Sequence, residues 1–185
     1  MSDGELDSFG KYLKLLQKWQ KSQRLIGSDN PEWIVENLFL DSLLFLKLLP
    51  LRAASLADVG SGAGVPGIPI KLVRPAVRLV LIESRAKRAS FLSAVIRELG
   101  LRDVDLVSQR VEEYAAQRPR SCDAAVMRCA GGFSSLARAA EPLVVPGGLV
   151  VASGPPKRKP LDVGAWVEVP GVRPGTRRQF AVYQA

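Results

Sequence analysis

The first fifty residues carry the spacing of amphipathic helices. Between residues 6 and 25, apolar side chains recur three or four positions apart, which places them on one face of a helix. They are Leu6, Phe9, Leu13 and Leu16, and a separate stripe holds Lys11, Lys14, Lys18 and Lys21. Asn30 before Pro31 starts a second helix, because asparagine caps free backbone N–H groups and proline suits a first turn. We expect this helix to run to about Leu49 and to end at Pro50.

From residue 51 onward the pattern changes to short apolar runs separated by helical stretches. The runs predict strands at residues 55–59, 78–83, 104–108, 123–127 and 149–153. The clearest helix between them covers residues 85–99 and ends at Gly100, a residue type that commonly terminates helices. Strands that alternate with helices indicate parallel βαβ units joined by right-handed crossovers. Residues 146–148, Pro-Gly-Gly, are interpreted as a turn before the fifth strand.

Two further strands are predicted near the carboxyl terminus, at residues 163–169 and 179–183. The Pro-Gly pairs at 170–171 and 174–175 lie between them and favour a turn, so the two strands should form an antiparallel hairpin at the sheet edge. The whole pattern predicts an α/β domain over residues 51–185, preceded by a helical region over residues 1–50.

Composition excludes several classes of protein. The chain has 185 residues, of which 47% are hydrophobic and 24% charged, as in soluble globular domains. The longest apolar run, residues 43–51, is interrupted by Lys47 and Pro50 and falls short of the ~20 residues that span a bilayer. The first thirty residues lack the apolar segment of a signal peptide. Cys122 and Cys129 form no disulfide framework, so we expect a cytoplasmic protein with no membrane association.

Charge and histidine content limit the chemistry. Twenty-six basic and eighteen acidic residues give a net charge of +8, which favours polyanionic partners through counterion release. A solvated basic surface explains the same charge equally well. The sequence contains no histidine, which excludes Ser-His-Asp triads, Cys-His pairs and histidine metal sites. We therefore expect no metal and a reaction that works without imidazole.

A glycine-rich segment over residues 58–67, Asp-Val-Gly-Ser-Gly-Ala-Gly-Val-Pro-Gly, follows the first predicted strand and precedes a helix. Glycines let the backbone turn sharply and let a ligand approach closely. Glu83 lies about twenty residues further on, where an acidic residue can accept hydrogen bonds from ribose hydroxyls. Two ligands fit this arrangement: a dinucleotide such as NAD, and S-adenosylmethionine (SAM), whose sites use an acidic residue followed by G-x-G-x-G.

Three features favour SAM. Asp58 precedes the glycines, as the SAM pattern requires. The chain has no Tyr-x-x-x-Lys pair, since Tyr114 is followed by Arg118, and no histidine to act as the acid of a dehydrogenase. The roughly 120 residues after the loop also leave no room for a separate substrate domain. An NAD-binding reductase is the less favoured alternative.

The chain resembles the bacterial RsmG family (GidB, glucose-inhibited division protein B), which methylates N7 of guanine in small-subunit rRNA. The most specific match is the segment over residues 58–69, where G-V-P-G-I-P follows the first glycines. The other matching segments are Lys18-Trp19-Gln20, Asp41-Ser42-Leu43, residues 82–88, residues 98–101, Arg110-Val111-Glu112-Glu113, and Arg128 with Ala130. Together they span about residues 15–154.

The resemblance implies a class I SAM-dependent methyltransferase fold, which is Rossmann-like, with N-terminal helices and a mostly parallel seven-stranded sheet that has one antiparallel strand. It implies SAM contacts near the methionine and ribose and near the adenine, and a part for Arg128 in SAM or substrate binding. With the loop glycines and the ribose acceptor, the predicted cofactor-binding residues are Gly60, Gly62, Gly64, Val65, Glu83, Val111, Glu112 and Arg128. Arg128 is also the predicted catalytic residue, because a guanidinium can contact guanine O6 or a phosphate through two hydrogen bonds.

The expected function is SAM-dependent methylation of N7 of a guanosine in 16S rRNA, with the 30S ribosomal subunit as partner and a monomeric enzyme. Guanine N7 carries a lone pair and no proton, so the transfer needs positioning and electrostatics rather than a general base. Some positions depart from the family pattern: Leu38 replaces a histidine, Gln20 an asparagine, and Ser153 stands where a lysine is expected. A non-catalytic RNA-binding or ribosome-assembly protein that retains SAM is therefore a further alternative.

Overall fold

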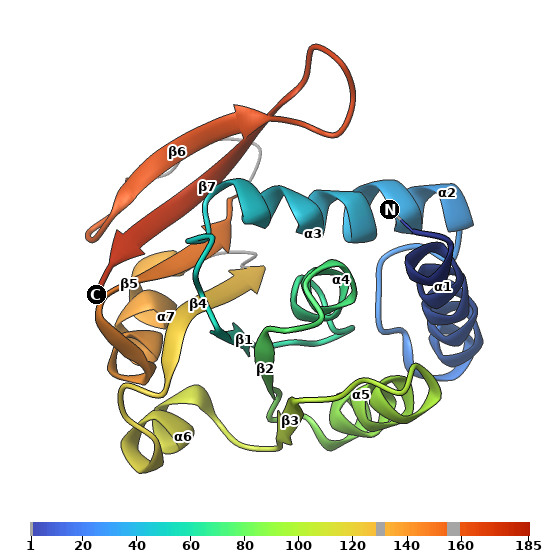
Figure 1. Ribbon diagram of the computed structural model, residues 1–185, viewed down its shortest axis with the longest axis horizontal. Coiled ribbons are helices and arrows are strands. Elements are labelled where there is room, and N and C mark those ends of the chain that lie inside the picture. The colour runs from blue at the N-terminus through green and yellow to red at the C-terminus, as the bar shows by residue number, and fades with distance from the viewer. Residues whose placement is uncertain (1, 129–131, 155–159) are drawn as a thin grey trace.

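A computed structural model of the chain describes residues 2–128, 132–154 and 160–185. Within these residues, seven strands form one sheet in the order β3-β2-β1-β4-β5-β7-β6 (Figure 1). The strands are β1 (Ser55–Val59), β2 (Arg78–Ile82), β3 (Val104–Val107), β4 (Cys122–Arg128), β5 (Val144–Ser153), β6 (Ala165–Pro170) and β7 (Arg177–Gln184). Strand β7 runs antiparallel to both of its neighbours, and the other pairs are parallel. The mostly parallel sheet and the edge hairpin are as the sequence predicts.

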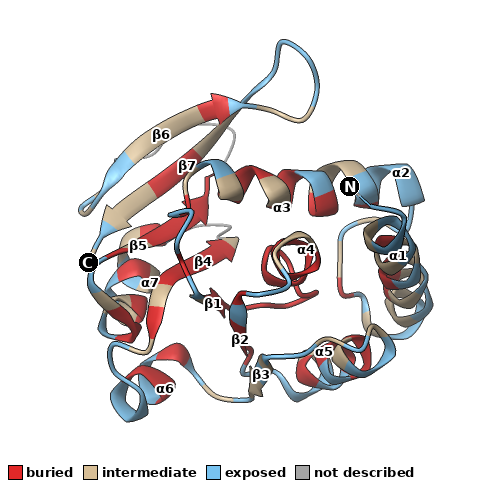
Figure 2. Cartoon of the chain, in the orientation of Figure 1, coloured by how far each residue is buried: buried red, intermediate tan, exposed pale blue. Residues whose placement is uncertain are grey.

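Helices cover both faces of this sheet. They are α1 (Asp3–Gln23), α2 (Pro31–Ile34), η1 (Val35–Leu40), α3 (Asp41–Leu43), η2 (Leu44–Lys47), α4 (Gly67–Val73), α5 (Ala86–Glu98), α6 (Val111–Gln117), α7 (Phe133–Ala140) and η3 (Glu141–Leu143). One apolar cluster joins a face of the sheet to the helices from α1 to α5, and a second joins the opposite face to α6, α7 and η3. Buried residues accordingly concentrate in the strands and in the sheet-facing sides of the helices (Figure 2). No helix among the described residues is long and apolar enough to cross a membrane.

Helix α1 begins at a capping box, in which the Ser2 side chain accepts from the Glu5 N–H and the Glu5 side chain accepts from the Ser2 N–H. Its buried face is formed by Phe9, Tyr12 and Leu16. Leu6, which the spacing places on that face, is 55% exposed, so this assignment is wrong. Packing against α4 and α5 selects the face on which Tyr12 lies. The four lysines of α1 are exposed, as predicted.

The second predicted helix is continuous over residues 31–47 but changes geometry within them, and we call it the 31–47 helical segment. The Asn30 side chain accepts from the Trp33 N–H at 2.8 Å, and Pro31 occupies the first turn, which confirms the predicted start. Residues 35–40 are π-helical, a geometry that is uncommon and often found near functional sites. The last turn ends at Lys47 rather than at Leu49.

The predicted turn at residues 146–148 is wrong. Strand β5 begins at Val144, and the pairing with β4 jumps from Val144, opposite Cys122, to Leu149, opposite Ala124. The residues between form a bulge held by the carboxyl terminus: the Gly147 N–H donates to the Ala185 carbonyl at 2.8 Å, and the Ala185 N–H donates to the Gly148 carbonyl at 2.9 Å. The Pro-Gly-Gly sequence therefore interrupts a strand instead of preceding one.

Candidate active site

The glycine loop, residues 60–66, connects the carboxyl end of β1 to α4. Strand β1 pairs with β2 on one side and β4 on the other, so the sheet order reverses at this point. Ligands of open α/β sheets bind outside the carboxyl ends of the strands where the order reverses. The loop therefore lies at the place where a ligand of this fold is expected.

Glu83 follows β2 and holds the loop in place. Its Oε2 accepts from the Gly62 N–H at 2.9 Å and its Oε1 from the Arg85 N–H at 2.9 Å. The side chain is only 4% exposed, and the Arg88 guanidinium lies 3.9 Å from Oε2. Because each carboxylate oxygen has a second lone pair, both can still accept a ribose hydroxyl. The structure thus brings together the predicted residues Gly62 and Glu83.

The loop glycines have different surroundings. Gly60 is exposed, has φ +69°, and has no described heavy atom within 4 Å of the position a Cβ would take. A Cβ on Gly64 would collide with Ile68 Cδ1 and lie 2.8 Å from Tyr12 Oη. Gly60 thus leaves room for a ligand such as SAM, whereas Gly64 is required by packing inside the protein.

Asp58 is fully buried near the end of β1 and is hydrogen-bonded to Gly67, the residue that follows the glycine loop. Its Oδ2 accepts from the Gly67 N–H at 3.0 Å, while Oδ1 has no hydrogen-bond partner among the described residues. Burial raises the pKa of this carboxyl from 3.8 to about 7; the Gly67 N–H and Arg128 oppose the rise, and Glu83 adds to it. The acidic residue of the SAM pattern is therefore an internal support whose charge depends on pH.

Tyr12 is a site residue that the sequence analysis missed. Its hydroxyl donates to the Ala63 carbonyl inside the glycine loop, and its ring stacks on Phe39 with centroids 4.9 Å apart. Helix α1 thereby contacts the loop directly. Helical spacing places Tyr12 on the same face as Phe9 and Leu16, which predicts its burial but not its contact with the loop.

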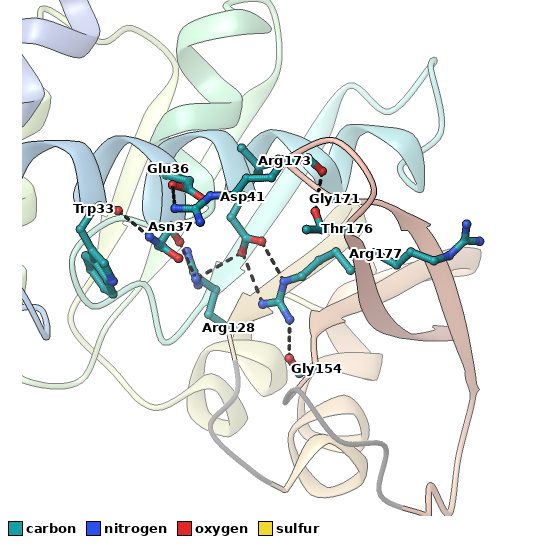
Figure 3. A pocket seen from close by; sticks show the side chains of 12 residues that line it. Trp33, Glu36, Asn37, Asp41, Arg128, Gly154, Gly171, Arg173, Thr176 and Arg177 are labelled. Carbon is teal, nitrogen blue, oxygen red and sulfur yellow. Dashed lines mark hydrogen bonds and ion pairs between the residues drawn. The ribbon is translucent and has the colours of Figure 1, made fainter.

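Arg128 ends β4, next to β1, and is held by the 31–47 helical segment (Figure 3). Its Nη2 donates to the Asn37 carbonyl at 2.9 Å and lies 3.3 Å from Asp41 Oδ2. Its buried Nη1 has no hydrogen-bond partner among the described residues. Burial lowers the pKa of Arg128, and Asp41 opposes that change. Arg128 is therefore preorganised with one nitrogen left unpaired.

Asp41 bridges two arginines from distant parts of the chain. Arg178, on β7, donates Nε to Asp41 Oδ1 at 2.8 Å and Nη1 to the Gly154 carbonyl at 2.6 Å (Figure 3). Because Arg128 contacts the other oxygen of the same carboxylate, one buried side chain links the helical segment to β4 and β7. Asp41 therefore has a structural role next to Arg128.

A pocket of about 570 Å³ opens beside Arg128, between the 31–47 helical segment and the β6–β7 turn (Figure 3). Its described lining consists of Trp33, Glu36, Asn37, Asp41, Arg128, Gly154, Gly171, Val172, Arg173, Thr176, Arg177 and Arg178. The lining has four arginines and two carboxylates, so it favours an anionic ligand.

The remaining predicted residues lie on neighbouring elements. Val111 and Glu112 begin α6, after β3, with Val111 buried and Glu112 exposed. Val65 is buried in the glycine loop. Their roles in binding SAM stay predictions. Ala130, part of the family resemblance, lies outside the described residues.

Comparison with known proteins decides which family has this architecture. The sequence pattern of the family described as rRNA small subunit methyltransferase G (GidB) matches residues 5–155. The chain belongs to this family. The resemblance inferred from the glycine loop is thus confirmed, and it favours the methyltransferase interpretation over the NAD-binding alternative.

Curated relatives carry the same family description. The chain is 35% identical over 166 residues to the ribosomal RNA small subunit methyltransferase G of Clostridium botulinum (strain Loch Maree / Type A3), covering 88% of this chain and 70% of that protein. It is 43% identical over 152 residues to the protein of the same name from Rubrobacter xylanophilus, covering 80% of this chain and 58% of that protein. For a second Clostridium botulinum relative (strain 657 / Type Ba4), the match spans 64% of the relative's length. The chain thus spans 58–70% of the length of these relatives.

Solved structures show the fold. A SAM-dependent methyltransferase from Aquifex aeolicus superimposes with a TM-score of 0.59 at 15% identity, covering 90% of this chain and 96% of that one. Precorrin-6y C5,15-methyltransferase from Geobacter metallireducens gives 0.55 at 17% identity, covering 87% and 90%. The predicted class I, Rossmann-like fold is confirmed. Family and fold together support SAM as the cofactor.

Proposed function

We propose that this chain is a SAM-dependent methyltransferase that methylates N7 of a guanosine in 16S rRNA. Family membership supports the reaction class. The observation that carries the proposal is the glycine loop tied to Glu83 at the end of β1, with Arg128 at the end of the adjacent strand β4. The loop that we assign to the nucleoside of SAM and the Arg128 guanidinium thus lie at neighbouring strand ends, where donor and acceptor can meet.

The residues present fit SAM. The open space at Gly60 accommodates a ligand against the loop backbone, and the carboxylate of Glu83 can accept ribose hydroxyls. We assign the methionine and ribose contacts to Gly60, Gly62 and Val65, and the adenine contacts to Val111 and Glu112. When bound, SAM supplies an electrophilic methyl group on a sulfonium.

The chain's own task is to position the acceptor. Guanine N7 has no proton to remove, so no residue has to act as a base, in keeping with the absence of histidine. Arg128 is held by Asn37 and Asp41, and we assign its guanidinium to guanine O6 or to a phosphate of the acceptor. Preorganised donors of this kind cost little reorganisation during the reaction.

The partner is proposed to be 16S rRNA within the 30S subunit, and the enzyme a cytoplasmic monomer that uses no metal.

The three family departures all have structural roles here. Leu38 is buried in the core, and Ser153 is buried at the end of β5. The Gln20 amide donates to the Ile26 carbonyl at 2.6 Å and accepts from the Ile26 N–H at 2.8 Å. These replacements are therefore accommodated by the fold, and the alternative of a non-catalytic RNA-binding protein is decided by the test below.

The test is transfer of labelled methyl from SAM to 30S subunits and to deproteinised 16S rRNA, both from cells that lack this methyltransferase. We expect incorporation into rRNA, and mass mapping should locate it on guanine N7. Binding of SAM without any transfer to either substrate would support the non-catalytic alternative. Binding of NAD and not of SAM, measured by calorimetry, would support the reductase instead.

A further inference from the structure

The pocket beside Arg128 has no assigned ligand. Arg128 ends β4, which pairs with β1 just before the glycine loop, and it also lines the pocket. A ligand in the pocket would therefore contact the residue to which we assign the positioning of guanine.

Guanidinium groups at the pocket keep donors for an anion. Arg173 forms a two-point ion pair with Glu36, Nε to Oε1 at 2.5 Å and Nη2 to Oε2 at 2.7 Å, and its side chain is 71% exposed. These contacts leave Nη1 of the largely exposed Arg173 available to a ligand. A guanidinium has five N–H donors, so it can keep a carboxylate and still bind a phosphate oxygen.

Trp33 adds an aromatic surface to the same pocket. It is 38% exposed although it is one of the largest apolar side chains, and its backbone is fixed by hydrogen bonds to Asn30 and Asn37. Figure 3 shows Trp33 at one end of the pocket, with the Arg173 guanidinium beside Glu36 on the same helical segment and Arg128 nearby. Aromatic side chains together with arginines are the combination that proteins use to stack unpaired bases and bind their phosphates.

The geometry of RNA adds a requirement. In an A-form duplex, guanine N7 faces a deep, narrow major groove that side chains cannot enter, so a base modified at N7 has to be unpaired or extruded. A pocket of about 570 Å³ lies within the size range of small-ligand sites. It can accept a nucleotide and cannot accept a duplex.

We propose that this pocket binds unpaired RNA at the target, with a base stacked on Trp33 and a phosphate held by Arg173. The proposal rests on the proposed function, because it assigns the acceptor side of the same site. It makes Trp33 and Arg173 substrate-binding residues, distinct from the phosphate contacts that basic surface residues make.

The first test replaces Trp33 in the full chain. Trp33→Ala should raise the KM for deproteinised 16S rRNA about tenfold, the order expected for one lost stacking contact. Trp33→Phe should retain most of the affinity, because it keeps an aromatic face. SAM affinity, measured by calorimetry, should stay at the wild-type value in both variants.

The second test separates binding from structure at Arg173. Arg173→Ala and Glu36→Gln both break the same ion pair, but only the first removes the guanidinium. We expect Arg173→Ala to raise the KM severalfold and Glu36→Gln to raise it clearly less, because the guanidinium is still present. Arg97→Ala is the matched control, because Arg97 is an exposed arginine paired with Glu98 on α5, away from this pocket. It should behave as wild type.

Affinity for a short single-stranded RNA with one guanosine gives a readout that needs no turnover. If wild type binds this RNA and the Trp33→Ala and Arg173→Ala variants bind it more weakly, the pocket assignment stands even if no methyl is transferred. If wild type methylates rRNA while both variants keep its KM and RNA affinity, the pocket assignment is wrong and the proposed function stands. Equal losses in Arg173→Ala and Glu36→Gln would also overturn the assignment of Arg173, since they indicate a structural ion pair only.

Discussion

An added methyl group should have different effects at two glycines of the same loop: it should weaken SAM binding at Gly60 and lower the stability of the protein at Gly64. At Gly60 the position that a Cβ would take is open, so alanine there meets no described atom. The only loss of stability comes from holding a non-glycine residue at a positive φ, about 1–2 kcal/mol. The new methyl group would occupy the space we assign to SAM. Gly60→Ala should therefore fold but lose most of the stabilisation by SAM, which for wild type is about 2.7 kcal/mol at a hundredfold excess over Kd.

Gly64→Ala is the matched comparison. Its Cβ would collide with Ile68 and crowd Tyr12, so the loss should appear in the free energy of unfolding without any ligand. Chemical denaturation with and without SAM measures both effects. Equal SAM stabilisation of Gly60→Ala and wild type would contradict a ligand role for Gly60.

Asp58 should make stability depend on pH in the reverse sense of an ordinary carboxylate. Its folded-state pKa of about 7 exceeds the ordinary 3.8, so the folded state binds the proton more tightly than the unfolded chain does. The associated stability is present below about pH 4, decreases as pH rises, and is lost above about pH 7. Asp58→Asn cannot ionise, yet its carbonyl can still accept the Gly67 N–H.

The comparison is the free energy of unfolding of Asp58→Asn minus that of wild type, measured by urea denaturation across this range. It should increase by up to about 4 kcal/mol between pH 4 and pH 7, at about 1.4 kcal/mol per pKa unit. Other titrating groups cancel in the difference. A difference that stays constant with pH would show that Asp58 is ionised in the folded protein throughout.

At the scale of elements, the β6–β7 hairpin is attached to the 31–47 helical segment by two ion pairs that differ in burial. Asp41 is 8% exposed and binds both Arg128 and Arg178, whereas Glu36 pairs with a largely exposed Arg173. Removing the charge of a buried partner leaves the two arginines uncompensated, which costs about 3 kcal/mol or more. Exposed pairs contribute about 0–1 kcal/mol.

We therefore expect Asp41→Asn to lower the free energy of unfolding far more than Glu36→Gln does. Thermal and chemical unfolding of the two variants, with wild type as reference, measure the difference. Comparable small losses would mean that Asp41 is screened by solvent and that the hairpin is held by the sheet alone.

The elements themselves could be predicted because their signals are local. The runs at residues 55–59 and 78–82 pair in parallel as expected, and the capping residues Asn30 and Gly100 act where their chemistry places them. The bulge at residues 145–148 could not be predicted, since it depends on hydrogen bonds to the carboxyl terminus.

The same limit applies to the site. The glycine loop and Glu83 follow from a motif and a spacing along the chain. The bridge of Asp41 to Arg128 and Arg178 joins three distant segments, and only the folded chain brings them together. Tyr12 was missed because an aromatic residue on an amphipathic helix looks like core until its hydroxyl is found to contact the loop.

At the scale of the whole molecule, we expect basic surface residues to provide most of the affinity for RNA and Arg128 to determine the rate of methyl transfer. Lys11, Lys14, Lys18 and Lys21 are exposed along α1, and each could contact a phosphate without reading sequence. Lys157 and Lys159, two further basic residues of the chain, lie outside the described residues. Replacing Lys14 or Lys18 by Ala should weaken RNA binding modestly and reduce its salt dependence by about one unit or less.

Arg128→Ala should instead reduce methyl transfer far more than RNA affinity, because most of the affinity comes from distant phosphates. Arg128→Lys should not restore the rate, because an ammonium lacks the planar guanidinium whose Nη2 contacts both Asn37 and Asp41 while its other nitrogens stay in a fixed geometry. Single-turnover methylation at saturating SAM and RNA measures the rate, and circular dichroism checks that the variants are folded, since Arg128 also ties β4 to the helical segment. If folded Arg128→Ala keeps the wild-type single-turnover rate, Arg128 serves structure or binding alone, and positioning of guanine has to come from another donor at the pocket.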